Sequence, residues 1–187
     1  LPYKELEDNA GWKYVTCNYT VININKSIWR EFMEIAEELV KLLKKQKLHI
    51  STAESLTGGM LASSLVDVAG ASDVFEEGYI TYSDAVKHKV LGASEEDLKE
   101  YTAVSSVIAG QMAEGAAKVS GSDITIATTG YAGPGAAEDG TPAGTVYIGV
   151  FYNGETDIRK FCFDGSRNDV RKQTVDEAIK LALQKLT

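Results

Sequence analysis

The spacing of apolar residues predicts helices at both ends of the main part of the chain. From Ser27 onward the residues at three-four intervals are Trp29, Phe32, Met33, Ala36, Leu39, Val40 and Leu43, which form one apolar helix face. The same period recurs from about residue 168 to residue 186. Shorter helices are predicted from about Thr57 to Val68 and over residues 84–91, 94–101 and 106–119. Ser83 and Ser105 precede two of them and are suited to cap their free N–H groups.

Five further segments have the apolar or alternating pattern of strands: residues 48–52, 74–82, 123–129, 144–152 and 156–163. Asn153-Gly154, between the last two, is the strongest hairpin signal in the chain. Strands that alternate with helices and end in one hairpin predict an α/β fold. We expect a three-layer α/β/α sandwich with a mixed, mostly parallel sheet covered by helices on both faces.

Residues 27–187 are therefore predicted to form one domain, and a chain of this length can bury a full core. Residues 1–26 show no helical period, although residues 14–24 have a composition compatible with a strand. We interpret residues 1–26 as a leader or the remnant of a preceding segment and assign them no role.

The composition is that of an ordinary globular protein, with 44% apolar and 25% charged residues. No apolar run approaches the roughly 20 residues that cross a bilayer, so we expect no membrane partner. The net charge of −8 leaves no basic stripe for DNA or RNA, whereas a small phosphorylated substrate needs only one or two arginines. Cys17 and Cys162 form neither a metal-binding spacing nor a disulfide framework, which favours a reducing, cytoplasmic location.

A strand-to-helix turn carries the first candidate site, with a helix predicted to begin near Thr57. Gly58 and Gly59 let another group approach the backbone, and the free N–H groups of a helix start bind anions. Ser55 would present its hydroxyl beside this positive dipole end. In the alternative interpretation, Ser55 or Thr57 is only an N-cap. Glu54 either orients a nearby group or stabilises the helix start as an acid.

The next strand-to-helix turn supplies a second pair of candidates. Tyr82 is expected at the end of a strand and Lys87 in the first turns of the following helix, so both can reach the cleft that holds Ser55. A lysine becomes a useful base only where burial or a neighbouring cation lowers its pKa. Otherwise Lys87 is a surface lysine and Tyr82 a half-buried aromatic residue.

The loop over residues 130–142 is rich in glycine, with Gly130, Gly133 and Gly135 directly after a strand. A dinucleotide-binding fingerprint is disfavoured, because Pro134 removes a donor and a second strand follows where a phosphate-binding helix is required. The loop is interpreted either as one wall of an active site or as simple turn chemistry.

Two arginines lie one helical turn apart near the start of the last helix. Arg167 and Arg171 have the spacing to clamp a carboxylate or phosphate. Alternatively, they pair with Asp164 or Asp169.

Taken together, these motifs resemble the C-terminal domain of the competence/damage-inducible CinA proteins, the nicotinamide-nucleotide amidohydrolase family. The resemblance covers about residues 27–187, and it rests on five motifs in one order: Ala53-Glu-Ser-Leu-Thr-Gly-Gly59, Gly78-Tyr-Ile-Thr-Tyr-Ser-Asp-Ala-Val-Lys87, Ala103-Val-Ser105, Thr129-Gly-Tyr-Ala-Gly-Pro-Gly135 and Pro142-Ala-Gly-Thr-Val-Tyr147.

The resemblance implies hydrolysis of the carboxamide of nicotinamide mononucleotide to the acid and ammonia, in pyridine nucleotide salvage, with no metal or organic cofactor. By motif matching, Ser55 falls on the nucleophile of the family, Lys87 on its general base and Tyr82 on the tyrosine that assists. An amide hydrolase needs these groups together with donors for the oxyanion.

The resemblance also implies a substrate-binding set and a homo-oligomer. Arg167 is the candidate for binding the substrate phosphate. The remaining substrate-binding residues are Glu54, Thr57, Gly58, Gly59, Gly130, Gly133 and Gly135. The chain departs from the family pattern at five positions. It has Leu56 where the family usually has Cys, Thr102 in place of Gly, Asp84 in place of Asn, Val86 in place of Glu and Tyr131 in place of Ile.

Two other functions compete with the amidohydrolase. One is a catalytically inactive nucleotide- or protein-binding domain of the competence/damage-inducible type, which would not need Ser55, Tyr82 and Lys87 together. The other is a nicotinamide-dependent dehydrogenase with a Ser-Tyr-Lys set. It is disfavoured because the glycine loop follows these residues in the chain and leads into a strand.

Overall fold

The computed structural model describes residues 3–7, 13–17 and 26–187. The chain separates into two compact units, Leu1–Arg30 and Glu31–Thr187. In the first unit, β1 (Tyr3–Glu7) and β2 (Lys13–Cys17) pair antiparallel. The strand predicted over residues 14–24 is thus present in part, and its remainder lies outside the described residues. The candidate site belongs to the second unit.

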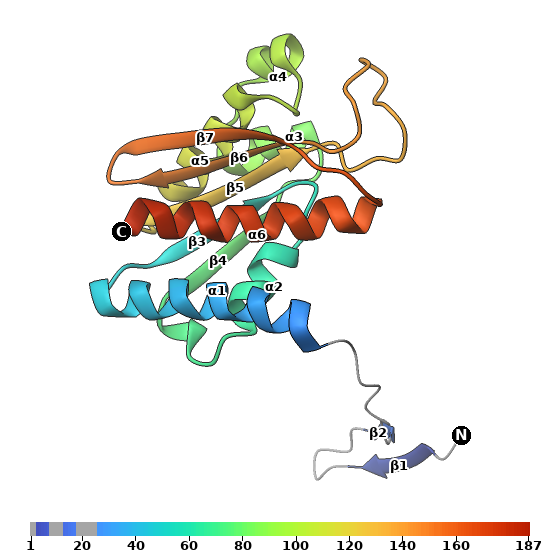
Figure 1. The fold of residues 1–187 in the computed structure, drawn as a ribbon, viewed down its shortest axis with the longest axis vertical. Coiled ribbons are helices and arrows are strands. Elements are labelled where there is room, and N and C mark those ends of the chain that lie inside the picture. Colours follow the sequence, from blue (N-terminus) through green and yellow to red (C-terminus); the bar gives the residue numbers. More distant parts are fainter. Residues whose placement is uncertain (1–2, 8–12, 18–25) are drawn as a thin grey trace. The chain divides into compact units, whose positions relative to one another are not determined.

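A five-stranded sheet forms the middle layer of the second unit (Figure 1). Its order is β4-β3-β5-β6-β7, and its strands are β3 (Ile50–Glu54), β4 (Phe75–Ile80), β5 (Ile124–Gly130), β6 (Thr145–Tyr152) and β7 (Glu155–Cys162). β3 runs parallel to both β4 and β5, whereas β6 is antiparallel to β5 and to β7. Four strands therefore point the same way, and the predicted mixed sheet is confirmed.

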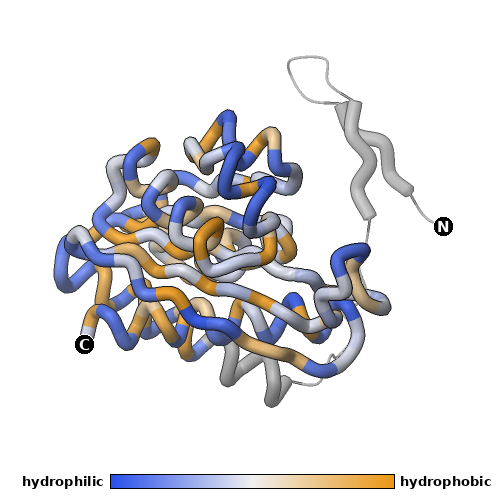
Figure 2. Tube along the Cα trace, turned by 90° about the horizontal axis from the view of Figure 1, so that it is seen from above, coloured by the Kyte–Doolittle hydropathy of each residue, from blue (hydrophilic) through white to orange (hydrophobic). Residues whose placement is uncertain are grey.

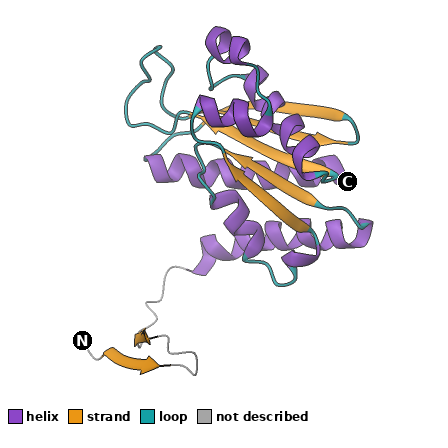
Figure 3. Cartoon of the chain, turned by 180° about the vertical axis from the view of Figure 1, so that it is seen from behind, coloured by secondary structure: helices purple, strands orange, loops and turns teal. Residues whose placement is uncertain are grey.

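Helices cover both faces of the sheet, which confirms the predicted three-layer architecture (Figures 1 and 3). One layer contains α1 (Lys26–Gln46), α2 (Met60–Val66) and α6 (Arg167–Leu186). The other contains α3 (Asp84–Leu91), α4 (Glu95–Tyr101) and α5 (Ser106–Ser120). A short 3-10 helix, Ala71–Asp73, precedes β4. Hydrophilic and hydrophobic positions alternate along the helices in Figure 2, as expected for amphipathic helices.

Local signals place most element ends where the sequence predicts them. Ser83 and Ser105 accept backbone N–H groups at the starts of α3 and α5. Gly92 ends α3 in the left-handed conformation, with φ at 72°. Asn153 and Gly154 both have positive φ, 52° and 80°, as a two-residue hairpin turn requires.

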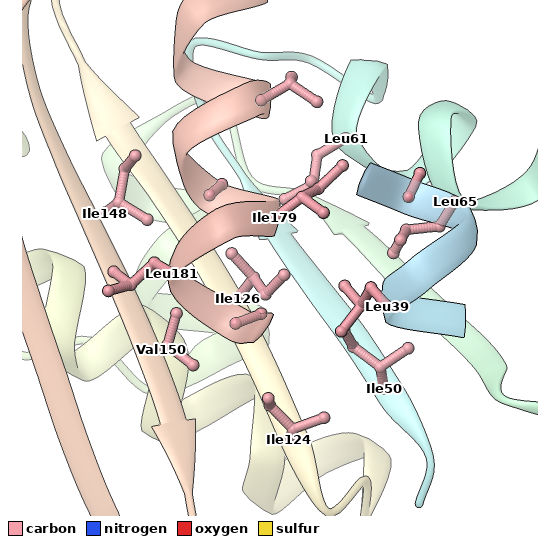
Figure 4. Close-up of a cluster of buried hydrophobic side chains, with 14 of the residues drawn as sticks. Leu39, Ile50, Leu61, Leu65, Ile124, Ile126, Ile148, Val150, Ile179 and Leu181 are labelled. Carbon is pink, nitrogen blue, oxygen red and sulfur yellow. The ribbon is translucent and has the colours of Figure 1, made fainter. Parts of the chain in front are cut away.

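The two faces of the sheet have different cores. Toward α1, α2 and α6 the core is built from large aliphatic side chains, among them Ile50, Ile124, Ile126, Leu61 and Ile179 (Figure 4). Toward α5 it is built mainly from small residues, such as Ala53, Ala113, Ala116 and Ala127. Because alternate strand residues face opposite sides, each strand can supply both cores.

Small residues let α5 approach the sheet closely. A Cβ added at Gly149 of β6 would lie 2.8 Å from the carbonyl oxygen of Ala109. Among the described residues, no helix has the length and apolar character needed to span a membrane.

Candidate active site

The candidate site lies at the carboxyl ends of β3, β4 and β5, where ligands of open α/β sheets usually bind. Ser55 follows β3 directly, and its backbone N–H donates to the carbonyl oxygen of Thr128 in β5 at 2.9 Å. Thr81 follows β4, and its N–H donates to the carbonyl oxygen of Glu54 at 2.8 Å. Sheet pairing thus continues past the strand ends and fixes where both turns begin.

The two turns bring a lysine amine to the serine hydroxyl. Lys87 Nζ donates to Ser55 Oγ at 3.3 Å and to the carbonyl oxygen of Thr81 at 3.0 Å. The Lys87 side chain is only 1% exposed, so the alternative of a surface lysine is wrong. Ser55 is also buried.

Burial lowers the pKa of Lys87 below its ordinary value, because the interior disfavours the ammonium. The Asp84 carboxylate, with Oδ1 at 3.9 Å from Nζ, acts in the opposite direction and more weakly. The net effect is a larger fraction of neutral amine beside the Ser55 hydroxyl at a given pH.

Tyr82 and Arg167 form a second part of the site. Tyr82 is 63% exposed rather than half-buried, and its hydroxyl accepts a hydrogen bond from Arg167 NH2 at 3.0 Å. Arg167 NH1 donates to the carbonyl oxygen of Gly133 at 2.8 Å, so α6 and the long loop after β5 meet here (Figure 1). The predicted alternative of pairing with Asp164 or Asp169 is wrong for Arg167, because its partners are the Gly133 carbonyl and the Tyr82 hydroxyl, while Asp169 accepts from Ser166 in the capping box of α6.

A cavity of about 220 Å³ joins these groups. Of the predicted site residues, its lining includes Ser55, Tyr82, Lys87, Gly130 and Arg167. The other lining residues are Leu56, Asp84, Ala103, Val104, Thr129, Tyr131 and Ala132. The hydroxyl of Tyr131 donates to the carbonyl oxygen of Pro134 at 3.4 Å, an exposed contact within the glycine-rich loop.

The remaining predicted substrate-binding residues do not line this cavity: Glu54, Thr57, Gly58, Gly59, Gly133 and Gly135. Glu54 is 1% exposed, and its carboxylate accepts the backbone N–H groups of Gly59, Leu61 and Ala62 at 2.9, 3.1 and 2.8 Å. These N–H groups are therefore not available to bind a substrate anion. The structure agrees with the alternative in which Glu54 stabilises the helix start.

The helix after Ser55 begins later than predicted, at Met60 rather than near Thr57. Gly58 and Gly59 are left-handed, with φ at 59° and 94°, and form the turn that separates Ser55 from α2. The Thr57 hydroxyl does not cap the helix but lies 2.7 Å from the Thr128 hydroxyl of β5.

Arg171 has a structural role that the sequence interpretation missed. Its Nε donates to the carbonyl oxygen of Leu56 at 3.0 Å, its NH2 to that of Thr57 at 2.7 Å and its NH1 to Asn168 Oδ1 at 3.3 Å. Arg171 thus clamps the turn after Ser55 rather than an anion. Asp84 was also missed, although its position three residues before Lys87 on a helix was a usable signal.

Within the described ranges, no group of three or more His, Cys, Asp or Glu side chains is placed to hold a metal ion. The ionisable and nucleophilic groups that line the cavity include the Ser55 hydroxyl, the Lys87 amine, the Tyr82 phenol, the Arg167 guanidinium and the Asp84 carboxylate. The fold and site together define a three-layer α/β/α protein with a buried serine–lysine pair at the carboxyl ends of parallel strands.

Comparison with known proteins then identifies the family. Residues 32–186 match the CinA C-terminal domain family. This chain is 46% identical over 145 residues to a Clostridium botulinum (strain Langeland) protein named "Putative competence-damage inducible protein", and 48% identical over 143 residues to one of the same name from Clostridium beijerinckii. These alignments cover 78% and 76% of this chain but 36% and 35% of the relatives. The chain belongs to the CinA C-terminal domain family and spans about a third of the length of these curated relatives.

Solved structures of the superfamily have the same fold. A CinA superfamily protein from Klebsiella pneumoniae 700603 superposes with a TM-score of 0.81 at 35% identity, covering 83% of this chain and 97% of that one. A competence or damage-inducible protein from Enterobacter asburiae gives a TM-score of 0.82 at 35% identity, covering 83% and 98%. The described domain therefore corresponds to nearly the whole of each of these structures.

Proposed function

We propose that this domain hydrolyses the carboxamide of a pyridine mononucleotide, nicotinamide mononucleotide, to the acid and ammonia. The observation that carries the proposal is the 3.3 Å contact between the buried amine of Lys87 and the hydroxyl of Ser55. A serine hydroxyl is a weak nucleophile unless a base removes its proton as it attacks, and a desolvated lysine is such a base near neutral pH.

In the first half-reaction, Lys87 takes the hydroxyl proton while Ser55 Oγ bonds to the carboxamide carbon and the π electrons move to the oxygen. The tetrahedral intermediate then collapses. The carbon–nitrogen bond breaks, the nitrogen receives the proton from Lys87, and ammonia leaves an ester on Ser55.

In the second half-reaction, Lys87 takes a proton from water, whose oxygen attacks the ester carbon. Collapse of this intermediate releases the carboxylic acid, and the proton returns to Ser55 Oγ. One water is consumed and one ammonia is released in each turnover.

The turn after Ser55 supplies candidate oxyanion donors. The Ser55 N–H is already bonded to Thr128, so it is not one of them. Arg171 binds the carbonyl oxygens of Leu56 and Thr57, and in trans peptide units the next N–H groups, of Thr57 and Gly58, point the opposite way. Thr57 and Gly58 do not line the cavity, whereas Leu56 does, so we assign the oxyanion to the Leu56 N–H.

We assign Arg167 and Tyr82, which are hydrogen-bonded to each other, to contacts with the nucleotide. Arg167 contacts two neutral oxygens, and no described carboxylate forms an ion pair with it, so its charge is free to attract a phosphate. Since the Tyr82 oxygen accepts from Arg167, its own O–H can donate to the departing nitrogen.

Ammonia release from nicotinamide mononucleotide tests the proposal. We expect turnover by the parent and by Ser63→Ala, an exposed serine of α2, and a loss of about a thousandfold or more in Ser55→Ala. Equal rates in parent and Ser55→Ala would rule out Ser55 as the nucleophile. No turnover in the parent would favour the binding-only domain.

Lys87→Arg separates charge from basicity. Arginine keeps the positive charge but does not become neutral near pH 7, so we expect turnover to fall as in Ser55→Ala. Full turnover in this variant would exclude Lys87 as the base. Arg167→Ala should raise KM for the nucleotide with little change in kcat, and an unchanged KM would remove Arg167 from phosphate binding.

A further inference from the structure

Asp84 brings a second charged group to the amine of Lys87. It is the first residue of α3, directly after the Ser83 cap, and it lines the same cavity as Ser55. Its Oδ1 lies 3.9 Å from Lys87 Nζ, and its side chain is 59% exposed. The amine therefore has the Ser55 hydroxyl and a carboxylate within 4 Å of it.

Several other ionisable groups of the surrounding elements have partners other than Lys87. The carboxylate of Glu54, on β3, is occupied by the N–H groups of α2, and the guanidinium of Arg167, on α6, contacts Tyr82 and Gly133. On α3, α4, α5 and β4, these groups have partners other than Lys87: His88 pairs with the Ala93 carbonyl and Glu95, Asp97 with Gln111, Glu114 with Thr156, and Tyr79 with Glu77. Within the described part of the chain, Asp84 is thus the only carboxylate paired with Lys87.

We propose that Asp84 is a positioning residue of this reaction, which stabilises the ammonium that Lys87 becomes when it takes the proton of Ser55. The inference rests on the proposed function. When the proton moves from Oγ to Nζ and the new carbon–oxygen bond forms, one positive charge appears at Nζ and one negative charge at the substrate oxygen. Asp84 stabilises the first of these, as the third member of a nucleophile–base–acid set.

The same interaction has two opposite consequences. It favours the ammonium of the free enzyme, so a higher pH is needed to obtain the neutral base. It also favours the ammonium in the transition state, so turnover is faster once the base is neutral. Asp84→Asn removes the charge and keeps the shape of the side chain, so it should change both properties.

The expected result for Asp84→Asn is a paired change in the pH profile of kcat. The acidic limb should move to lower pH, and the plateau at high pH should fall about two- to fivefold, the scale of an ion pair with one half-exposed partner. A merely structural role would lower the rate without moving the limb. The matched control is Glu95→Gln, which removes one negative charge from the neighbouring helix α4, where Glu95 lies 4.0 Å from His88 Nε2.

A second measurement does not depend on turnover. Lysine labelled with ¹³C at Cε is titrated by NMR in the parent, Asp84→Asn and Glu95→Gln, and the Lys87 resonance is assigned by its loss in Lys87→Arg. We expect the Lys87 midpoint to fall in Asp84→Asn and to stay at the parent value in Glu95→Gln.

The outcomes separate this inference from the proposed function. An unchanged or raised midpoint in Asp84→Asn overturns the inference, whatever the turnover. So does an equal fall in Glu95→Gln, which would show a diffuse field rather than a contact. A lowered midpoint with an unchanged plateau overturns the role in the transition state. Absence of turnover in the parent overturns the proposed function, and the positioning role of Asp84 with it.

Discussion

Each of the two strand-to-helix junctions of the site buries one ionisable side chain, but the two side chains differ in their hydrogen-bond partners. Glu54, at the end of β3, and Lys87, in the first turn of α3, are each 1% exposed. The Glu54 carboxylate accepts three backbone N–H groups between 2.8 and 3.1 Å. The Lys87 amine contacts two neutral oxygens, and the Asp84 carboxylate is 3.9 Å away.

The difference lies in how completely protein hydrogen bonds replace the water that each charged group loses on burial. A buried charge that keeps a full set of hydrogen bonds stabilises the structure around it. A buried charge with few partners is held at a cost to stability, and its pKa moves. The first junction therefore fixes the backbone behind Ser55, and the second holds an amine whose pKa is lowered.

The largest expected effect comes from Lys87→Met. Methionine fills a similar volume without a base, so we expect turnover to fall about a thousandfold while the fold is retained. Urea unfolding at pH 7 should show the variant to be more stable by about 1 to 3 kcal/mol, because a poorly compensated buried charge is gone. Lys89→Met, an exposed lysine of the same helix, is the control and should leave both values unchanged.

The stability gain of Lys87→Met should depend on pH. The folded state lowers the pKa of Lys87 below the ordinary 10.5, so between the two values the unfolded chain binds more protons than the folded one. Parent stability therefore rises with pH through this interval, and the gain of the variant shrinks toward pH 10.5. A gain that stays constant or grows with pH would contradict the lowered pKa.

Glu54→Gln should act mainly on stability. The amide keeps the shape but turns one acceptor into a donor that faces backbone N–H groups, so we expect a loss of about 3 kcal/mol in urea unfolding. The exposed Glu38→Gln in α1 should change stability by less than about 0.5 kcal/mol. A loss of turnover in Glu54→Gln without a loss of stability would mean that the two junctions do not divide their roles in this way.

Arg171→Lys should give the smallest of these effects. Lysine can reach one carbonyl but cannot bind those of Leu56 and Thr57 with a planar fork, so about 1 to 2 kcal/mol of stability should be lost. Arg159→Lys, on an exposed strand, is the control. If stability is unchanged in Arg171→Lys, the clamp on the turn is not required.

The fold could be predicted from the sequence because its signals are local. A serine cap acts on an N–H group three residues away, and the turn at Asn153-Gly154 needs only those two residues, so these boundaries were correct. The start of α2 was wrong by about three residues. Gly58 and Gly59 adopt a left-handed turn that Glu54 and Arg171 hold in place, and Arg171 lies more than a hundred residues further along the chain.

The candidate site divides in the same way. The sequence alone determined the layered α/β fold, the order of the motifs and the choice of Ser55, Tyr82 and Lys87 as a set. Only the tertiary structure decided that the Lys87 amine is buried against Ser55, that Glu54 caps α2, and that Arg171 holds the turn while no described carboxylate pairs with Arg167. The physical reason is that capping and turn energies depend on neighbouring residues, whereas desolvation and hydrogen-bond partners depend on every element that packs around a group.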